Sequence, residues 1–550
     1  MENVNIFALG GQDENGKNCY VFEHNNDIYV INAGVKVPIE SNNGVDTLIP
    51  DFSYLEKNKD RIKGIFITDI KNESFSALPW LLMRIPNLKV YTSAFNKVMI
   101  LERIAKYGID NEHYEVVALK HKTQIGSVDV LSFTLTGSMP GNVGFNFQTN
   151  SGDYVFMFNY IEGDLGIYGK TNFKTLLKFF NNRKVSALVT DAGKSHTSGR
   201  ALDKFNNTEL IQKVFASTSD ENRIIVGAYG EEMVSIQHVL NLAKKYNRPV
   251  VAYGKNYAEL LYLVRKISPN LDLPEIIDHK QIQKAPNAVV LVTATTERLY
   301  SRFLRITDNK DVYLKINNND SVILMAPPVN GLESQYAYMM DEIARITPHL
   351  YDVQDKDYFY VRPTREDLFQ LCKTINPDIF IPTQGLYRYL VDASNYIVEE
   401  SNKQFTTSPL VLQNGKIAHF VDGKIFSHNG KIKEVGNTII DGFGVGDISQ
   451  EVIAEREALG REGVIVINAV YSPKTKRIVG QIHIDYLGVI DKHEQDAIDN
   501  LIKETIIDIL KTKTFPNMRE LNERIRKTVR KRIFKSTDKD PMVTLTLTSI

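Results

Sequence analysis

Cysteine is almost absent from this chain, in which only Cys19 and Cys372 occur among 550 residues. Two thiols so far apart argue against a disulfide framework and against a thiolate zinc site, and they fit a reducing compartment. Long apolar runs are also missing, since none reaches the roughly 18 to 20 residues that a membrane-spanning helix needs. The first residues hold no basic segment followed by a long apolar one. We therefore expect a cytoplasmic protein that has no membrane partner.

The chain has no net charge, because 66 basic residues balance 66 acidic ones. Any affinity for a polyanion must therefore arise from local clusters of charge. Hydrophobic residues make up 43% and charged residues 24%, a composition typical of folded soluble proteins. Because a single core rarely grows beyond roughly 250 to 300 residues, a chain of this length should contain more than one domain.

The pattern of strands and helices changes along the chain. Residues 1–195 contain short strands rich in β-branched and aromatic residues, which predicts a layered α/β domain. Residues 196–345 alternate strands with amphipathic helices, as in a doubly wound α/β domain. Residues 346–435 return to the first pattern, so the middle segment is predicted to be an insertion. We expect a linker over 436–454 and a small α+β domain over 455–550.

Several stretches form an ordered set of motifs: ALGGQDENGKNCYVFE, NAGVKVP, GVDTLIPDFSYLEKNKDRIKGIFIT, SALPWLL, IPTQGLYRYL, DGFGVGDISQEVIAERE and the dipeptide PM at 541–542. In this order they resemble the motifs of the ribonuclease J family, over nearly the whole chain and least clearly over 196–345. The resemblance implies a metallo-β-lactamase αββα sandwich with an inserted doubly wound α/β domain of the β-CASP type. It also implies a small C-terminal α+β domain for dimerisation or RNA association.

The family's chemistry needs histidines and a bridging aspartate that hold two zinc or manganese ions, which activate a water and neutralise the scissile phosphate. The positions that match this site carry other residues here: Asn32, Asp69, Lys71, Glu73, Ser74, Gly137, Asn159 and Gln384. A further family histidine aligns within a residue or two of Arg362. Because amides and a glycine cannot replace imidazole ligands, we expect no metal cofactor and no catalytic residue.

The resemblance and the lost ligands together predict a non-catalytic ribonuclease J-like subunit. It would associate with RNA and with an active ribonuclease J paralogue, with itself, or with both, as a dimer or tetramer, in RNA processing and mRNA decay. A second hypothesis is an active metal-dependent ribonuclease, a 5′–3′ exonuclease or endonuclease, whose altered site uses Asp69, Glu73 and Asp191 with magnesium. A third is a free-standing RNA-binding protein. In the simpler interpretation, Asp191 only caps the loop that follows it.

Two cations lie at or near former ligand positions. Lys71 and Arg362 could partly replace the missing metal charge and hold a phosphate without hydrolysing it. The alternative is that Lys71 pairs with Asp69 or Glu73 and refills an abandoned pocket.

An aromatic run, Tyr358-Phe359-Tyr360, is a second candidate for contact with RNA, because aromatic rings stack on bases. Such a run is also typical of packing within the fold, so both interpretations stay open at this point.

The densest cluster of basic residues lies near the end of the chain: Arg519, Arg524, Arg526, Lys527, Arg530, Lys531, Arg532, Lys535 and Lys539. Arg526, Arg530 and Arg532 are candidate contacts to an RNA backbone. The alternative is a solvated helix face that balances Glu520 and Glu523.

Overall fold

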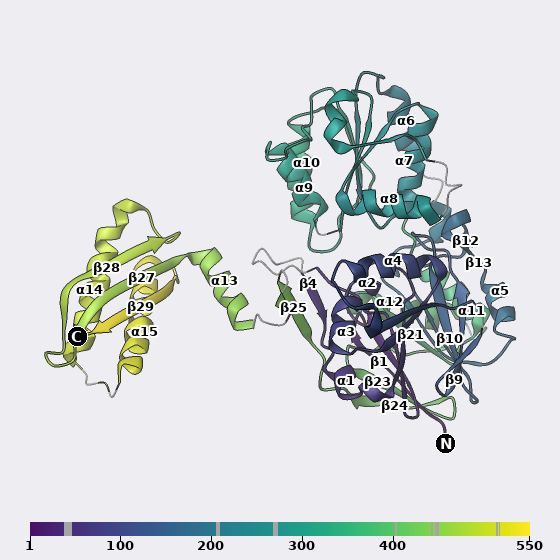
Figure 1. Ribbon diagram of the computed structural model, residues 1–550, viewed down its shortest axis with the longest axis horizontal. Coiled ribbons are helices and arrows are strands. Elements are labelled where there is room, and N and C mark those ends of the chain that lie inside the picture. The colour runs from purple at the N-terminus through teal and green to yellow at the C-terminus, as the bar shows by residue number, and fades with distance from the viewer. Residues whose placement is uncertain are drawn as a thin grey trace. The chain divides into compact units, whose positions relative to one another are not determined.

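The computed structural model describes residues 1–37, 47–120, 122–204, 209–267, 273–296, 298–401, 404–441, 444–445, 450–512, 515 and 517–550. The chain forms two compact units, of which the first ends at Thr438 and the second contains Ile439–Ile550. Figure 1 shows both, coloured from purple at the N-terminus to yellow at the C-terminus. Within the described ranges, no helix is both long enough and apolar enough to cross a membrane.

The first unit is built on two mixed β-sheets, with strand orders β24-β23-β1-β2-β3-β5-β6-β7 and β22-β21-β14-β11-β10-β9-β8. The strands of the first sheet are β1 (Asn3–Gly10), β2 (Cys19–His24), β3 (Asp27–Ile31), β5 (Ile62–Phe66), β6 (Leu88–Thr92), β7 (Tyr114–Ala118), β23 (Lys416–Val421) and β24 (Lys424–Lys431). Those of the second are β8 (Thr123–Ile125), β9 (Val128–Thr134), β10 (Val143–Gln148), β11 (Asp153–Met157), β14 (Val185–Asp191), β21 (Ile379–Thr383) and β22 (Ser408–Pro409). Short strands outside both sheets are β4 (Thr47–Pro50), β12 (Gly163–Asp164) and β13 (Lys170–Thr171).

Late segments of the chain complete both sheets. Strand β23 pairs antiparallel with β1, and β21 pairs parallel with β14. The segments before and after the middle of the sequence therefore share one fold, with their cores in common.

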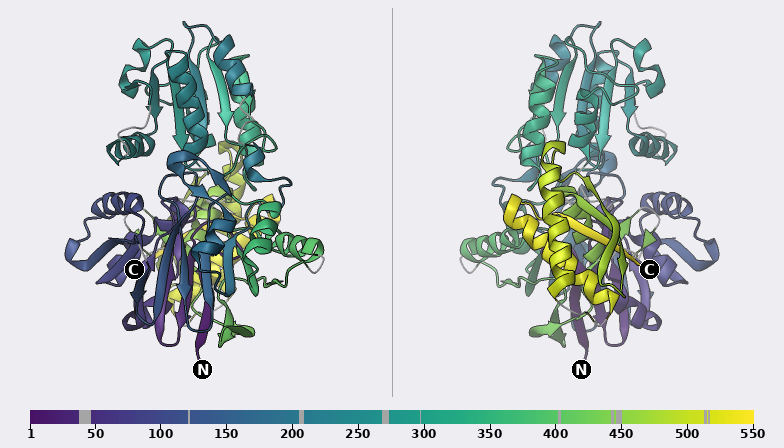
Figure 2. Two further views of the ribbon diagram at one scale, coloured as in Figure 1. Left: turned by 90° about the vertical axis from the view of Figure 1, so that its right-hand side faces the viewer. Right: turned by 90° about the vertical axis from the view of Figure 1, so that its left-hand side faces the viewer.

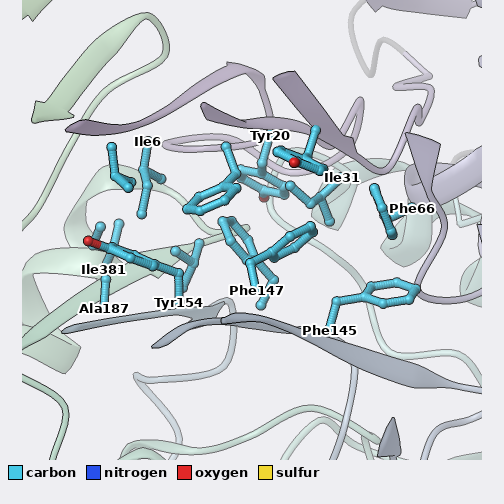
Figure 3. Close-up of a cluster of buried hydrophobic side chains, with 14 of the residues drawn as sticks. Ile6, Tyr20, Ile31, Phe66, Phe145, Phe147, Tyr154, Ala187 and Ile381 are labelled. Carbon is cyan, nitrogen blue, oxygen red and sulfur yellow. The ribbon is translucent and has the colours of Figure 1, made fainter. Parts of the chain in front are cut away.

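Aromatic side chains fill the space between the two sheets (Figure 3). Tyr20 and Phe66 of the first sheet face Phe147 and Tyr154 of the second, and all four are buried. The rings of Phe22 and Phe147 lie 4.9 Å apart between their centroids. Each such side chain contributes roughly 1.5 to 3 kcal/mol by leaving water. The alternation of strand residues accounts for this core, since every second side chain points to the same face.

Helices cover the outer faces of both sheets, and in the left view of Figure 2 the purple and green helices lie on opposite sides of the strands. These helices are α1 (Ser53–Lys57), α2 (Asn72–Phe75), α3 (Leu78–Arg84), α4 (Ala94–Ala105), α5 (Phe173–Phe179), α11 (Arg365–Ile375) and α12 (Tyr387–Ser401). Helix α11 begins with a capping box between Thr364 and Asp367. The αββα sandwich that the resemblance implied is confirmed.

The middle segment forms its own parallel sheet, with strand order β17-β16-β18-β15-β19-β20. Its elements are α6 (Glu209–Ser217), β15 (Ile224–Tyr229), α7 (Met233–Lys245), β16 (Val250–Tyr253), α8 (Lys255–Ile267), β17 (Ile276–Ile277), β18 (Val289–Ala294), α9 (Leu299–Thr307), β19 (Ser321–Met325), α10 (Glu333–Ala344) and β20 (Leu350–Asp352). In Figure 1, α6 and α7 lie on one side of the strands and α9 and α10 on the other. Continuous apolar runs such as 224–229 are typical of strands buried on both faces. The sheet reaches Asp352, beyond the boundary at 345 that the sequence indicated.

The second unit holds a small sheet with strand order β28-β27-β29. Its elements are β25 (Asn437–Asp441, which begins in the first unit), β26 (Gly444–Val445), α13 (Gln450–Glu462), β27 (Val464–Ser472), β28 (Arg477–Leu487), α14 (Gln495–Thr512), α15 (Met518–Thr537) and β29 (Met542–Ser549). Leu521, Ile525, Val529 and Ile533 form the buried stripe of α15, one residue in every four, as a helix packed on one face requires. The expected linker over 436–454 contains β25 and the start of α13, and its residues 442–443 and 446–449 lie outside the described ranges.

Glu2 attaches the N-terminus to the turn between β10 and β11. Its carboxylate accepts hydrogen bonds from the backbone amides of Asn150 and Ser151, at 3.2 and 2.9 Å, and from the hydroxyls of Thr149 and Ser151. Burial alone would raise the pKa of Glu2, but these bonds and one with His24 outweigh it and lower the pKa to about 2.

We expect the change Glu2→Gln to remove stability that depends on pH. A depressed pKa in the folded state stabilises the protein above the ordinary value of 4.5 and loses this effect as the pH falls toward 2. The variant should lose about 1 kcal/mol at pH 7, after allowance for solvent screening, and little near pH 2.5. Urea unfolding at both pH values measures this difference. The change Glu115→Gln, at an exposed ion pair with Lys89, is the control, and equal losses at both pH values would contradict the assignment.

Candidate functional site

Asp69 lies at the centre of the candidate site, in the loop that follows β5. Its Oδ2 accepts hydrogen bonds from the hydroxyls of Thr68 and Ser74, at 2.9 and 3.0 Å, and from the amide of Asn159 at 3.2 Å. Its Oδ1 accepts the backbone amide of Lys71 at 3.0 Å. Burial raises the pKa of Asp69, although these hydrogen bonds oppose the shift. Both carboxylate oxygens therefore already have protein donors.

The backbone around Asp69 is left-handed at three of the positions that the resemblance matches to the family's metal site. The angle φ is 65° at Asn32, 53° at Asn159 and 58° at Gln384. Residues other than glycine rarely adopt this conformation, and asparagine adopts it most readily. Asn32 and Thr68 also bond to each other through side chains and backbone, at 3.0 to 3.1 Å. The local backbone is thus strained in the way that active sites often are, while its side chains are neutral amides.

Gly137 has no room for a side chain. A Cβ added there would lie 2.7 Å from the Cβ of Asn142, whose amide donates to the carbonyl of Asn159 at 2.8 Å. A histidine at this position would need the neighbouring chain to move.

Lys71 is buried and pairs across the first unit with Glu232, at the start of α7. The distance from Lys71 Nζ to Glu232 Oε1 is 2.7 Å, and the two side chains are 6% and 12% exposed. Burial alone would lower the pKa of Lys71, but the Glu232 carboxylate outweighs it and raises the pKa. The adjacent Glu231 accepts the backbone amide of Asn72 at 2.8 Å, and its carbonyl accepts the Ser138 hydroxyl at 2.8 Å. The predicted partners of the Lys71 ammonium, Asp69 or Glu73, were wrong.

Arg362 pairs with Glu73 and lies 3.7 Å from Asp191 Oδ1. Burial would lower the pKa of Arg362, but Asp191 and Glu73 outweigh it and raise the pKa. Burial would raise the pKa of Glu73, but Arg362 and Lys71 lower it. At Asp191 burial prevails, so its pKa is raised despite Arg362. Asp191 Oδ1 also accepts the amide of Gly193 at 2.8 Å, the loop-capping role that the sequence suggested.

A cavity of about 520 Å³ opens outside this ion-pair network, between the sandwich and the carboxyl ends of strands β15 and β18. Open α/β sheets usually bind ligands at such strand ends. The charged residues that line the cavity are Glu14, Lys36, Lys71, Glu73, Lys194, Glu231, Glu232, Asp355 and Arg362. Acidic and basic groups are mixed, so the cavity is open but not a basic groove.

Comparison with known proteins points to one family. Residues 221–343 match the family model "Ribonuclease J, beta-CASP domain", and residues 451–550 match "Ribonuclease J C-terminal domain". Ribonuclease J2 of Bacillus subtilis is 26% identical, over 98% of each chain, and ribonuclease J 2 of Staphylococcus aureus is 25% identical, over 98% of this chain and 97% of that one. The chain therefore carries regions that match two ribonuclease J domains and resembles ribonuclease J proteins over nearly its whole length. A Mycoplasma genitalium protein named "Uncharacterized protein MG423" is 28% identical over the full length of both chains. A crystal structure of a protein of unknown function from Enterococcus faecalis shares the fold, with 11% identity and a TM-score of 0.52 over 76% of this chain.

The residues present do not fit the two metal ions of the ribonuclease J family. Each of the three acids in reach has protein partners: Asp69 is bound by amides and hydroxyls, and Glu73 and Asp191 face Arg362. Lys71 adds a second fixed positive charge, which would repel a divalent cation. In the described residues no group of three or more His, Cys, Asp or Glu side chains is arranged to hold a metal ion.

The aromatic run is mostly buried. Tyr358 and Phe359 are 2% and 7% exposed, which leaves neither ring a face for a base. Tyr360 lines the cavity, donates to Asp355 at 2.8 Å and lies under Lys194, whose Nζ is 3.5 Å from the ring centroid. The stacking prediction is therefore wrong for Tyr358 and Phe359, which pack within the fold.

The candidate arginines of the C-terminal domain differ from one another. Arg530 pairs with Asp540 through two hydrogen bonds of 2.5 Å, and Arg532 contacts Asp508 at 3.3 Å and Thr505 at 3.1 Å. Arg526 is exposed. Two of the three predicted RNA contacts are thus engaged in holding α15 to its own domain.

Sequence reasoning missed Glu231 and Glu232. The signal was available in part, because two acids follow directly after β15 in a domain predicted to be doubly wound. Nothing in the sequence placed them beside Lys71, which is 161 residues away from Glu232.

Proposed function

We propose that this chain is a non-catalytic subunit that associates with RNA and with an active ribonuclease J, in cytoplasmic RNA processing and mRNA decay. The observation that carries the proposal is the pair of buried cations at the former metal centre. Lys71 and Arg362 supply positive charge that holds Glu232, Glu73 and Asp191 in place. A fixed ammonium or guanidinium cannot generate a metal-bound hydroxide. The proposal includes no metal cofactor.

The cavity supports a role in contact with RNA. It has a volume of about 520 Å³ beside the ion pairs of Lys71 and Arg362, and Lys36, Lys194 and Tyr360 lie on its wall. Because Lys71 and Arg362 are already neutralised by carboxylates, we assign them to the ion-pair network and not to a phosphate. An RNA end can enter such a cavity without meeting a nucleophile.

The second unit supports a role as a partner of other chains. Its residues 451–550 match the family model "Ribonuclease J C-terminal domain". We assign to this domain the association with an active ribonuclease J, with a second copy, or with both.

We expect the purified chain to hydrolyse no RNA. Labelled single-stranded RNA carrying a 5′-monophosphate is incubated with the protein and, in turn, manganese, zinc or magnesium, and the products are separated on a gel. An active ribonuclease J supplies the positive control in the same buffers. Cleavage that a chelator abolishes, together with bound metal in the purified chain, would favour the altered-site enzyme with Asp69, Glu73 and Asp191.

Association is tested separately from catalysis. Tagged protein is purified from its own cells at low salt, and the proteins that accompany it are identified. Recovery of an active ribonuclease J supports the subunit role. If RNA binds but no ribonuclease J is recovered, the free-standing RNA-binding protein is the better description.

A further inference from the structure

Helix α15 carries a row of three exposed lysines. Lys527, Lys531 and Lys535 are exposed and recur every four residues, on the side of the helix away from its buried stripe. A four-residue step advances about 6 Å along a helix, so the three ammonium groups form a line about 12 Å long. Arg524 is exposed beside this line, one turn before Lys527.

The pairing of charges on α15 is uneven. Arg530 and Arg532 are bound to Asp540 and Asp508. Among the described residues, no acidic side chain lies within ion-pairing distance of Lys527, Lys531 or Lys535. Like charges four residues apart destabilise a helix, by about 0.2 to 0.5 kcal/mol a pair. Because these exposed cations repel one another along one face of the helix, an external anion that binds all three would relieve the repulsion.

We infer that the Lys527, Lys531 and Lys535 face of α15 is an RNA-backbone contact surface; the inference rests on the proposed association with RNA. Evenly spaced cations suit a polymer with evenly spaced phosphates. Phe534, 49% exposed, lies among them and offers a ring face to an unpaired base. Since the whole chain is neutral, attraction to RNA must come from a local surface of this kind. The surface thus replaces Arg530 and Arg532 as the site of contact.

The test uses the full chain and a fluorescein-labelled single-stranded RNA of about 20 nucleotides. Each backbone contact to a single strand contributes about 0.7 to the slope of log affinity against log salt. The variant K527Q/K531Q/K535Q should therefore lower that slope by about 2 and weaken binding at least tenfold near 0.1 M salt. Phe534→Ala should weaken binding about fivefold or more with an unchanged slope, because stacking carries no charge.

A matched control removes three exposed cations elsewhere in the same domain, in the variant K474Q/K476Q/R477Q. We expect it to keep the wild-type slope and affinity, and circular dichroism melts show that every variant is folded. If wild-type protein binds no RNA even at 50 mM salt, the proposed function fails and the inference with it. If wild type binds but the two triple variants behave alike, only the inference fails. Unchanged RNA binding with lost binding to polyglutamate would assign the face to an acidic protein and overturn the RNA assignment.

Discussion

Replacing Arg362 with methionine is expected to lower the free energy of unfolding of the first unit by about 3 to 5 kcal/mol. Arg362 is the cation nearest to two buried carboxylates, Glu73 and Asp191, whose side chains are 18% and 0% exposed. Methionine fills similar space but leaves both acids without this partner. Trp80, the only tryptophan, lies in α3 of the same unit, so its fluorescence during urea unfolding reports the loss.

At acid pH, the Arg362→Met variant should lose less stability relative to wild type than at pH 7. In the wild type, the Arg362 guanidinium holds the pKa of Glu73 below its usual range, against the effect of burial. That depressed pKa gives stability above pH 4.5, which is lost as the pH falls. The variant lacks this contribution to stability. Its loss of unfolding free energy relative to wild type should therefore be largest at pH 7 and become smaller below pH 4.

The control for Arg362 is Arg365→Met in the same segment. Arg365 is 32% exposed and contacts Glu366 at 3.5 Å, so the change should cost less than about 1 kcal/mol. Similar losses from both variants, or a loss at Arg362 that does not depend on pH, would contradict the assigned network.

The sequence was a good guide to the fold because local patterns specify it. Short stretches rich in β-branched and aromatic residues predicted strands of the first domain, and Tyr20 and Phe22 of β2 do lie between the sheets. The four-residue stripe of α15 likewise follows from spacing alone. The extent of the middle sheet was underestimated, since β20 has only three residues and carries little pattern.

For the candidate site, the sequence could predict only which metal ligands are missing. A missing imidazole is visible in the sequence at Gly137 or Gln384, but the replacement contacts depend on side chains brought together by folding. Glu232 reaches Lys71 from the middle sheet, and Asp540 reaches Arg530 across ten residues of helix end and turn. Only the folded structure shows which cations have acidic partners. In α15 it makes Lys527, Lys531 and Lys535 better candidates for RNA contact than Arg530 and Arg532, which the sequence had favoured.

The ion pair between Lys71 and Glu232 yields the other large expected effect. Lys71→Met should cost about 3 to 5 kcal/mol, because it leaves a buried carboxylate without its cation. The single change Glu232→Gln should also be costly. The double variant K71M/E232Q removes both charges, so it should be less destabilised than the two single losses together, by about 1 to 3 kcal/mol.

Urea unfolding followed by Trp80 fluorescence measures this cycle. Lys106 and Glu259 form the control, because they also join the sandwich to the middle sheet but are 54% and 39% exposed. The cycle K106M/E259Q should give a coupling below about 1 kcal/mol. If the changes at Lys71 and Glu232 were additive, the buried pair would not be what holds α7 against the former metal centre. A coupling confined to the buried pair would identify it as the contact that holds α7 against the loop around Asp69.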